Sequence, residues 1–249
     1  MAAPAYAAAG AGDAVDGGAS STVNPAYPSG IVAGDLLLLQ VAMTEQGEPW
    51  NVNVPSGWTE LHADENGGAA GNDIRQEIFA KSASGSESGT LAVTMVAGGA
   101  DGPFMARMYR VTGWLNDATM ANNFEGAAVT SGTSTTISAP SVTTVGAERL
   151  CVAFVAVSDD NALDAFTGET GGDWTEAVAE FTTLAATDGA LGLQIATLAT
   201  ATTISGGTDT MAASDGWVCR AFAIKPAAAA GLAAEPSYTF QAVKRASYW

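Results

Sequence analysis

The runs DLLLLQVAM (Asp35–Met43) and RLCVAFVAV (Arg149–Val157) decide the fold class of this chain. Short apolar runs that are rich in Leu and Val and bounded by turn residues are typical of β-strands. Because nearly every position is apolar, each strand should be buried on both faces and lie centrally in its sheet. A second unit or a neighbouring chain would then cover its far side. We predict an all-β protein, an antiparallel β-sandwich of jelly-roll-like type.

The two runs belong to a repeat that covers most of the chain. Four more blocks match in order: Pro28–Gly34 with Pro140–Gly146, GWTE (Gly57–Glu60) with DWTE (Asp173–Glu176), Gln76–Ala83 with Leu193–Thr200, and Met105–Val111 with Val218–Ile224. The spacing between matched blocks stays between 112 and 117 residues. Chance rarely keeps one spacing over several blocks, so the sandwich is predicted to be internally duplicated.

The duplication divides the chain into segments. We predict an N-terminal arm (1–22), unit one (23–114), a connection (115–136), unit two (137–226) and a C-terminal arm (227–249). The connection should add an extra strand near residues 127–137. A single fused sandwich of the two units is favoured over two tandem domains.

The C-terminal arm differs from the rest of the chain in charge. It holds one acidic and two basic residues, whereas the whole chain carries −17, so the remainder carries −18. An aromatic, slightly cationic arm can dock on an acidic body, its own or a neighbour's. We expect the assembly contacts of this arm to be Tyr238, Phe240, Lys244, Arg245, Tyr248 and Trp249.

The net charge also limits the classes of partner that the chain can bind. With 26 acidic and 9 basic residues, the chain repels phosphate backbones and anionic lipid surfaces. Nucleic acid and membranes are therefore poor partners. Two explanations of the acidic composition remain open: solubility in a salty medium, or one specific cationic partner. The sequence has no apolar run long enough for a membrane span and no signal-peptide pattern. Cys151 and Cys219 are expected to be free buried thiols, with a disulfide possible only if their strands are neighbours.

Residues that could support catalysis are few. His62 is the single histidine and is expected in a loop, LHADEN, without a nucleophile elbow. Glu60 and Glu176 recur at equivalent places, as strand-edge residues of a duplicated scaffold do, so a glycosidase pair is disfavoured. The loops Gly67–Gly71 and Gly168–Gly172 lack the ending of a phosphate-binding loop and are predicted to be turns. We predict a protein that is not an enzyme and has no cofactor.

Calcium is the strongest ligand candidate. Asp159, Asp160, Asn161 and Asp164 follow the second long strand in one loop and offer hard oxygen ligands. The spacing is not that of an EF-hand, and ordinary turn or cap duty is the alternative. A second acidic stretch, Asp64–Asn66, is a weaker candidate.

Repeated large side chains indicate structural roles. Arg107 and Arg220 occupy the closing strands, where each is expected to anchor a loop or strand end within its own unit. Trp58 and Trp174 are equivalent and should lie in the core. Sequences around Trp50 and Trp114 indicate loops, in which exposed rings could stack on sugars.

Several motifs together resemble a loose group of β-sandwich structural proteins of tailed bacteriophages, found on heads and tails. The motifs are Gly34–Leu38, Pro55–Thr59, Ile78–Thr90 and Arg107–Arg110, and the similarity covers about residues 20–226. They are fold signatures, with Gly57 making a turn and Trp58 filling the core.

This resemblance implies a function in the virion. It implies a protein that decorates or cements the head surface, assembles in the host cytoplasm, and contacts the major capsid protein, other virion proteins and further copies of itself. A tail or fibre adhesin that binds host-surface carbohydrate is the alternative.

Overall fold

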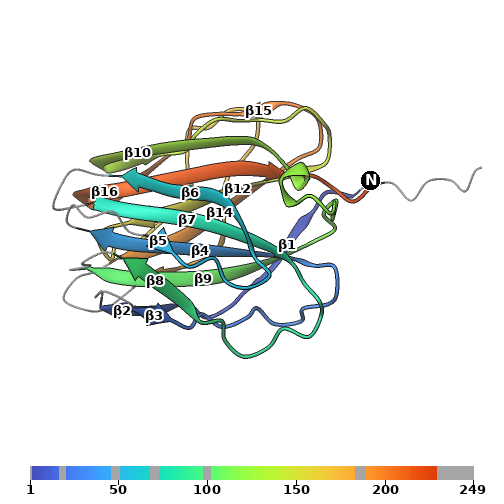
Figure 1. Cartoon of the computed structure of the whole chain (residues 1–249). Coiled ribbons are helices and arrows are strands. Elements are labelled where there is room, and N and C mark those ends of the chain that lie inside the picture. Colours follow the sequence, from blue (N-terminus) through green and yellow to red (C-terminus); the bar gives the residue numbers. More distant parts are fainter. Residues whose placement is uncertain are drawn as a thin grey trace, which may run out of the picture.

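The computed structural model describes residues 2–16, 21–45, 51–67, 73–97, 102–182 and 189–228. Nearly all of the regular structure is antiparallel β-sheet (Figure 1). The prediction of an all-β sandwich is therefore confirmed.

Unit one forms the first large sheet. Its strands run in the order β1-β9-β4-β7-β6, with β2 also paired to β9. Their bounds are β1 Ala5–Ala9, β2 Asp13–Asp16, β4 Leu36–Glu45, β6 Thr59–Gly67, β7 Asp73–Ser82 and β9 Pro103–Thr112.

Unit two forms the second large sheet with the same arrangement, in the order β10-β16-β12-β14-β13. Its strands are β10 Phe124–Ser138, β12 Arg149–Val157, β13 Thr175–Thr182, β14 Ala190–Leu198 and β16 Thr208–Ile224. The long apolar runs form β4 and β12, each flanked by two strands. The matching strand orders show the internal duplication in three dimensions.

Two small sheets and one helical turn complete the regular structure of the described residues. The strands β3 (Thr22–Val23), β8 (Val93–Ala97) and β5 (Asn51–Val52) form a three-stranded sheet, and β11 (Val142–Thr143) pairs with β15 (Thr203–Ile204). The 3₁₀ turn η1 (Met120–Asn123) precedes β10.

The large sheets pack face to face through two buried apolar clusters, and we call the larger of them the core. Leu36 and Leu38 of β4 point toward the second sheet, where Val152 and Phe154 of β12 belong to the same buried cluster. Successive strand residues face opposite sides, so the neighbouring residues Leu37 and Cys151 point away from this core. Both long strands are therefore buried on both faces, as predicted.

Each small sheet covers the outer face of its own large sheet. Val23, Val52 and Val93, one from each strand of the three-stranded sheet, pack in the cluster that contains Trp58. Val142 and Ile204 pack in the corresponding cluster of unit two with Trp174. The assignment of both tryptophans to the core is confirmed, and the units form one layered body.

A tight turn brings Trp58 to this core. Gly57 has φ +79°, a conformation that side chains rarely adopt, and Trp58 donates its backbone N–H to the Pro55 carbonyl at 3.0 Å. The Pro-Ser-Gly-Trp motif is thus a turn that delivers a core side chain.

The predicted N-terminal arm was wrong. Residues 5–9 and 13–16 are strands that pair with β9, in the position that β10 has beside β16. Ala-rich segments are weak strand formers, so only the ladder to β9 defines β1. The predicted extra strand exists as β10, and it belongs to unit two. The predicted C-terminal arm lies outside the described residues from Ala229 onward.

Candidate functional site

One concavity lined by described residues lies where the edges of the two large sheets meet. β6 contacts both β10 and β16 across the sandwich, and Figure 1 shows β6 and β10 together on one side of the molecule. We call this boundary the β6–β10 seam. A pocket of about 260 Å³ opens in it, lined by Thr59–His62 of β6, Ala121 of η1 and Phe124–Ala127 of β10.

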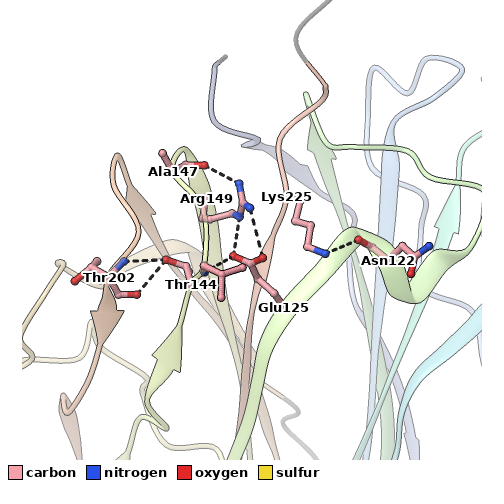
Figure 2. A network of polar contacts seen from close by, with 8 residues as sticks. Asn122, Glu125, Thr144, Ala147, Arg149, Thr202 and Lys225 are labelled. Atoms are coloured by element: carbon pink, nitrogen blue, oxygen red, sulfur yellow. Dashed lines mark hydrogen bonds and ion pairs between the residues drawn. The ribbon is translucent and has the colours of Figure 1, made fainter.

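A polar network fixes the β10 wall of this pocket (Figure 2). The Glu125 carboxylate accepts a hydrogen bond from Arg149 Nε at 2.8 Å and one from the Val145 backbone N–H at 3.1 Å. Arg149 also donates to the Ala147 carbonyl at 2.6 Å. The Glu125 and Arg149 side chains are 9% and 12% exposed, so the ion pair anchors β10 to the start of β12.

The η1 turn is fixed by one fully buried amide. Asn123 Oδ1 accepts the Asp117 N–H at 2.7 Å, and Asn123 Nδ2 donates to the Met120 carbonyl at 2.9 Å. Lys225, the residue after β16, donates a hydrogen bond from Nζ to the Asn122 carbonyl of the turn at 2.8 Å (Figure 2). These bonds hold η1 against the last residues of β16, so the pocket wall is preformed.

His62 lies in the pocket as an electrically neutral side chain. Burial, together with repulsion from the Arg220 guanidinium, lowers the pKa of His62 to about 4. Its imidazole packs against the Phe222 ring, with 5.4 Å between centroids. The residue was predicted in a loop; instead it belongs to β6, because the sequence around it continues the ladder to β7 through two register shifts.

The pocket chemistry favours binding of an apolar group with a nearby cation. Leu61 and Phe124 supply apolar wall, whereas the exposed Glu60 adds a carboxylate that makes no ion pair in the described part of the chain. The Glu125 charge is already balanced by Arg149. An aromatic or aliphatic side chain beside a Lys or Arg fits these walls best.

At two other described places the sheets approach each other closely. At the far end of the same seam, a Cβ on Gly67 would lie 2.0 Å from the Trp217 carbonyl oxygen, so only glycine permits this approach. On the opposite side of the sandwich, Arg107 donates to the Ala179 carbonyl of β13 at 2.6 Å and to the Gly10 carbonyl at 3.3 Å.

Two of the four candidate calcium residues, Asn161 and Asp159, use their side chains in contacts within the fold, whereas Asp160 and Asp164 are exposed and contribute backbone groups. Asn161 donates from Nδ2 to Asp215 Oδ2 at 3.1 Å and accepts the Ala212 N–H at 3.3 Å. Asp159 accepts the Asp160 N–H at 2.8 Å. Asp164 contributes its backbone N–H and carbonyl to Asp209 and Gln194.

No group of three His, Cys, Asp or Glu side chains with metal-binding geometry occurs among the described residues. Calcium binding by Asp159, Asp160, Asn161 and Asp164 stays a prediction. The backbone of Asp64–Asn66 belongs to β6 rather than to a loop.

The carboxylates Glu60 and Glu176 are separated by the fold. They are exposed residues of β6 and β13, the outer strands of different sheets. The two glutamates thus lie on equivalent edge strands of the duplicated fold, as the sequence predicted. Gly168–Gly172 is a bend region in which Thr170 bridges to Ser205, whereas most of Gly67–Gly71 lies outside the described residues.

The two cysteines are free and buried, as expected. They lie on neighbouring strands, but Cys151 is opposite Ala223 and Cys219 is opposite Val155, so they are out of register for a disulfide. Burial raises the pKa of the Cys151 thiol to about 12 and also raises that of Cys219.

Two interpretations of large side chains need correction. Trp114 is 3% exposed and donates Nε1 to the Gly34 carbonyl at 2.6 Å, so it has no free ring face for sugars. Trp50 lies outside the described residues. Arg107 was expected to act within unit one, but it also binds Ala179 of unit two, and the Arg220 charge acts on His62 of unit one.

Glu125, Asn123 and the pocket itself were not found from the sequence. Glu125 is the single charged residue of β10, which is a signal for a specific partner, but its partner Arg149 is 24 residues away. The expected assembly residues from Tyr238 to Trp249 lie outside the described residues.

No protein-family model, curated protein or solved structure matches this chain. The helical turn in the described part of the chain is too short to cross a membrane.

Proposed function

We propose that this protein is a structural component of a tailed-bacteriophage virion that decorates or cements the head surface. The observation that carries the proposal is that the repeated residues occupy equivalent structural positions in the two units. Trp58 and Trp174 fill equivalent cores, and β4 and β12 are buried on both faces in equivalent sheets. The duplicated motifs thus form the cores of both units, which supports a structural role of the kind that the resemblance to phage β-sandwich proteins implies.

The charge of this body supports attachment to another protein. A net charge of −17 disfavours nucleic acid and favours a cationic protein surface. The proposed partners are the major capsid protein, other virion proteins and further copies of this chain. The proposed location is the virion surface, reached by assembly in the host cytoplasm.

Capsid binding tests this proposal. Purified full-length chain is mixed with phage capsids stripped of surface proteins, and bound protein is measured by sedimentation. We expect saturable binding that falls by about tenfold or more in a variant carrying Tyr238→Ala, Phe240→Ala and Trp249→Ala. A matched Val32→Ala variant, altered at an exposed residue of unit one, should bind as well as the unaltered chain.

Two results would reject the head-surface function. One is the absence of binding to stripped capsids at any concentration. The other is retention on host cells or their polysaccharide without capsid binding, which would favour the adhesin. Buried Trp114 removes one of the two aromatic rings on which the adhesin interpretation depends.

A further inference from the structure

The pocket of the β6–β10 seam lies where both of its walls depart from regular strand pairing. The ladder between β6 and β7 shifts register between Glu60 and His62, and the ladder between β10 and β16 shifts between Glu125 and Ala128. Both shifts coincide with segments that line the pocket. Shifts of this kind re-aim side chains and are frequent next to active sites. The opening is therefore built by two irregular strand segments.

The shift in β10 depends on a glycine. Gly126 has φ +67°, and a Cβ there would lie 2.5 Å from the Thr143 carbonyl oxygen. Backbone conformation and lack of space therefore both exclude a side chain at this position. The next residue, Ala127, is exposed and also lines the pocket. The β10 wall thus carries small residues where the pocket opens.

Aromatic rings form another wall of the pocket. His62 and Phe124 line it, and each packs against the fully buried Phe222, with 5.4 Å and 5.2 Å between ring centroids. Phe222 in turn stacks on Phe154 at 5.7 Å. His62 and Phe124 are only half-buried, so the pocket lies at the outer end of an aromatic cluster that reaches into the core. Because aromatic pairs gain energy beyond the burial of their area, a further ring is favoured over an aliphatic chain.

The volume of the pocket limits its occupant to one ring system. The pocket measures about 260 Å³, whereas a cavity of roughly 150 Å³ holds one benzene. Sites for drug-sized ligands usually span about 300–1,000 Å³. The pocket therefore has the size of one aromatic side chain rather than that of a large cofactor.

Nearby charges fix the orientation of the ring. On the inner side, the Arg220 guanidinium acts on His62, whose pKa of about 4 keeps it neutral at pH 7, so a further cation is disfavoured there. On the exposed side, Glu60 makes no ion pair in the described part of the chain. The Glu125 carboxylate is already bound by Arg149. A ring that points inward with a cation beside it at Glu60 fits both sides, and the −17 net charge of the chain favours the same sign of partner.

We propose that this pocket binds an aromatic side chain that stands next to a Lys or Arg in a partner protein of the virion, with the ring against His62 and Phe124 and the cation at Glu60. The buried ring supplies the affinity. An exposed ion pair contributes little affinity, so the charge acts mainly on the choice of partner segment. The inference rests on the proposed role in a virion, and it names the chemistry of the contact.

Capped dipeptides test this chemistry on the full-length chain. Acetylated Trp-Lys amide is titrated into the protein, and the backbone amide shifts are followed by NMR. We expect saturable shifts centred on residues 59–62 and 121–127. Trp-Glu and Leu-Lys amides should bind about threefold or more weakly, because one lacks the cation and the other lacks the ring. Equal binding of all three dipeptides, shifts confined to other residues, or no binding would overturn the proposal.

Variants at Glu60 separate the local charge from the net charge. Glu60→Gln should weaken binding of Trp-Lys amide by about two- to fivefold. Glu176→Gln, at the equivalent exposed residue of β13, alters the net charge equally and should leave binding unchanged. Glu60→Lys should reverse the preference, so that Trp-Glu amide binds more tightly than Trp-Lys amide. Equal effects of Glu60→Gln and Glu176→Gln would overturn the proposal.

A substitution that fills the pocket tests the site of the ring. Ala127→Trp places a ring of the chain itself in the pocket, so binding of Trp-Lys amide should be lost. Val32→Trp, at a site 58% exposed in unit one, is the matched control and should bind the dipeptide as the unaltered chain does. Unchanged binding by Ala127→Trp would place the dipeptide elsewhere and overturn the proposal.

Stripped capsids distinguish this inference from the proposed function. Where the unaltered chain binds capsids, Ala127→Trp and Glu60→Lys should weaken that binding by about tenfold or more. Unchanged capsid binding by both variants would overturn the inference and leave the head-surface function standing. Absence of capsid binding by the unaltered chain would reject the head-surface function. In that case, Trp-Lys binding in the pocket would still support the inference, and its absence would overturn it.

Discussion

Gln40 of β4 donates a hydrogen bond from Nε2 to the backbone carbonyl of Val155 in β12, at 2.8 Å. This bond crosses the core between the two large sheets, where Gln40 is fully buried. The other end of the amide, Oε1, accepts the Tyr109 hydroxyl at 2.8 Å. Because a buried polar group must find a partner, the three residues align the sheets in a way that apolar packing alone does not.

The Gln40–Tyr109 pair should behave as a coupled unit in stability measurements. Tyr109→Phe leaves Gln40 Oε1 without this donor, and Gln40→Leu leaves the Tyr109 hydroxyl without this acceptor. Each single change should lower the free energy of unfolding by about 1–3 kcal/mol. The double variant should lose less than the sum, measured by urea denaturation. Strictly additive losses would show that the hydrogen bond contributes no coupling.

The neutral state of His62 predicts a pH dependence of stability. The pKa of His62 is about 4 in the folded protein and about 6.5 when unfolded. As pH falls from 6.5 to 4, the unfolded chain binds a proton that the folded chain does not, so stability decreases. The loss is at most about 3 kcal/mol.

The measurement compares unaltered chain with His62→Gln at pH 7.5 and pH 4.5. Burial raises the pKa values of Glu176, Asp209 and Asp215, which titrate with the opposite effect in both proteins. The difference between the two proteins isolates His62. An equal change of stability with pH in both would contradict the assigned charge state.

Glu87 should stabilise the loop after β7. Burial of the carboxylate opposes ionisation, but hydrogen bonds from the Ser84 backbone and the Lys81 ammonium outweigh it and lower the pKa of Glu87 to about 2. Glu87→Gln should cost about 2 kcal/mol at pH 7. This stabilisation is complete above pH 4.5 and is lost as pH falls toward 2.

Thermal or urea unfolding across this pH range tests Glu87. The gap between the unaltered chain and Glu87→Gln should narrow steadily below pH 4.5. Asp173→Asn, at an exposed residue before β13, serves as the control and should change stability little. A difference in stability that stays constant down to pH 2 would show that ionisation of Glu87 is not the source of the stabilisation.

The cysteines should be unreactive in the folded protein. Both thiols are buried, and the pKa of each is raised, so the reactive thiolate is scarce at pH 8. A chromogenic disulfide reagent should modify both cysteines promptly in denaturant and neither in buffer. Fast reaction of one thiol in buffer would indicate that its strand opens to solvent.

The sequence by itself determined which segments become central strands and how the chain is duplicated. DLLLLQVAM and RLCVAFVAV are apolar at almost every position, so only burial on both faces satisfies them. Trp58 and Trp174 follow turn residues at equivalent positions, which identified them as core. These features are local or repeated, and local pattern is what sequence reasoning can use.

Only the tertiary structure decided which segments pair at the sheet edges and which distant side chains meet. Ala5–Ala9 has little strand preference and becomes β1 because β9 offers a ladder for it. Trp114 is buried because Gly34, distant in sequence, accepts its indole N–H. Glu125 and Arg149 meet only after β10 and β12 have joined the same sheet. Each outcome depends on a partner brought close by the chain fold, and the residues on either side do not show which distant residue that partner will be.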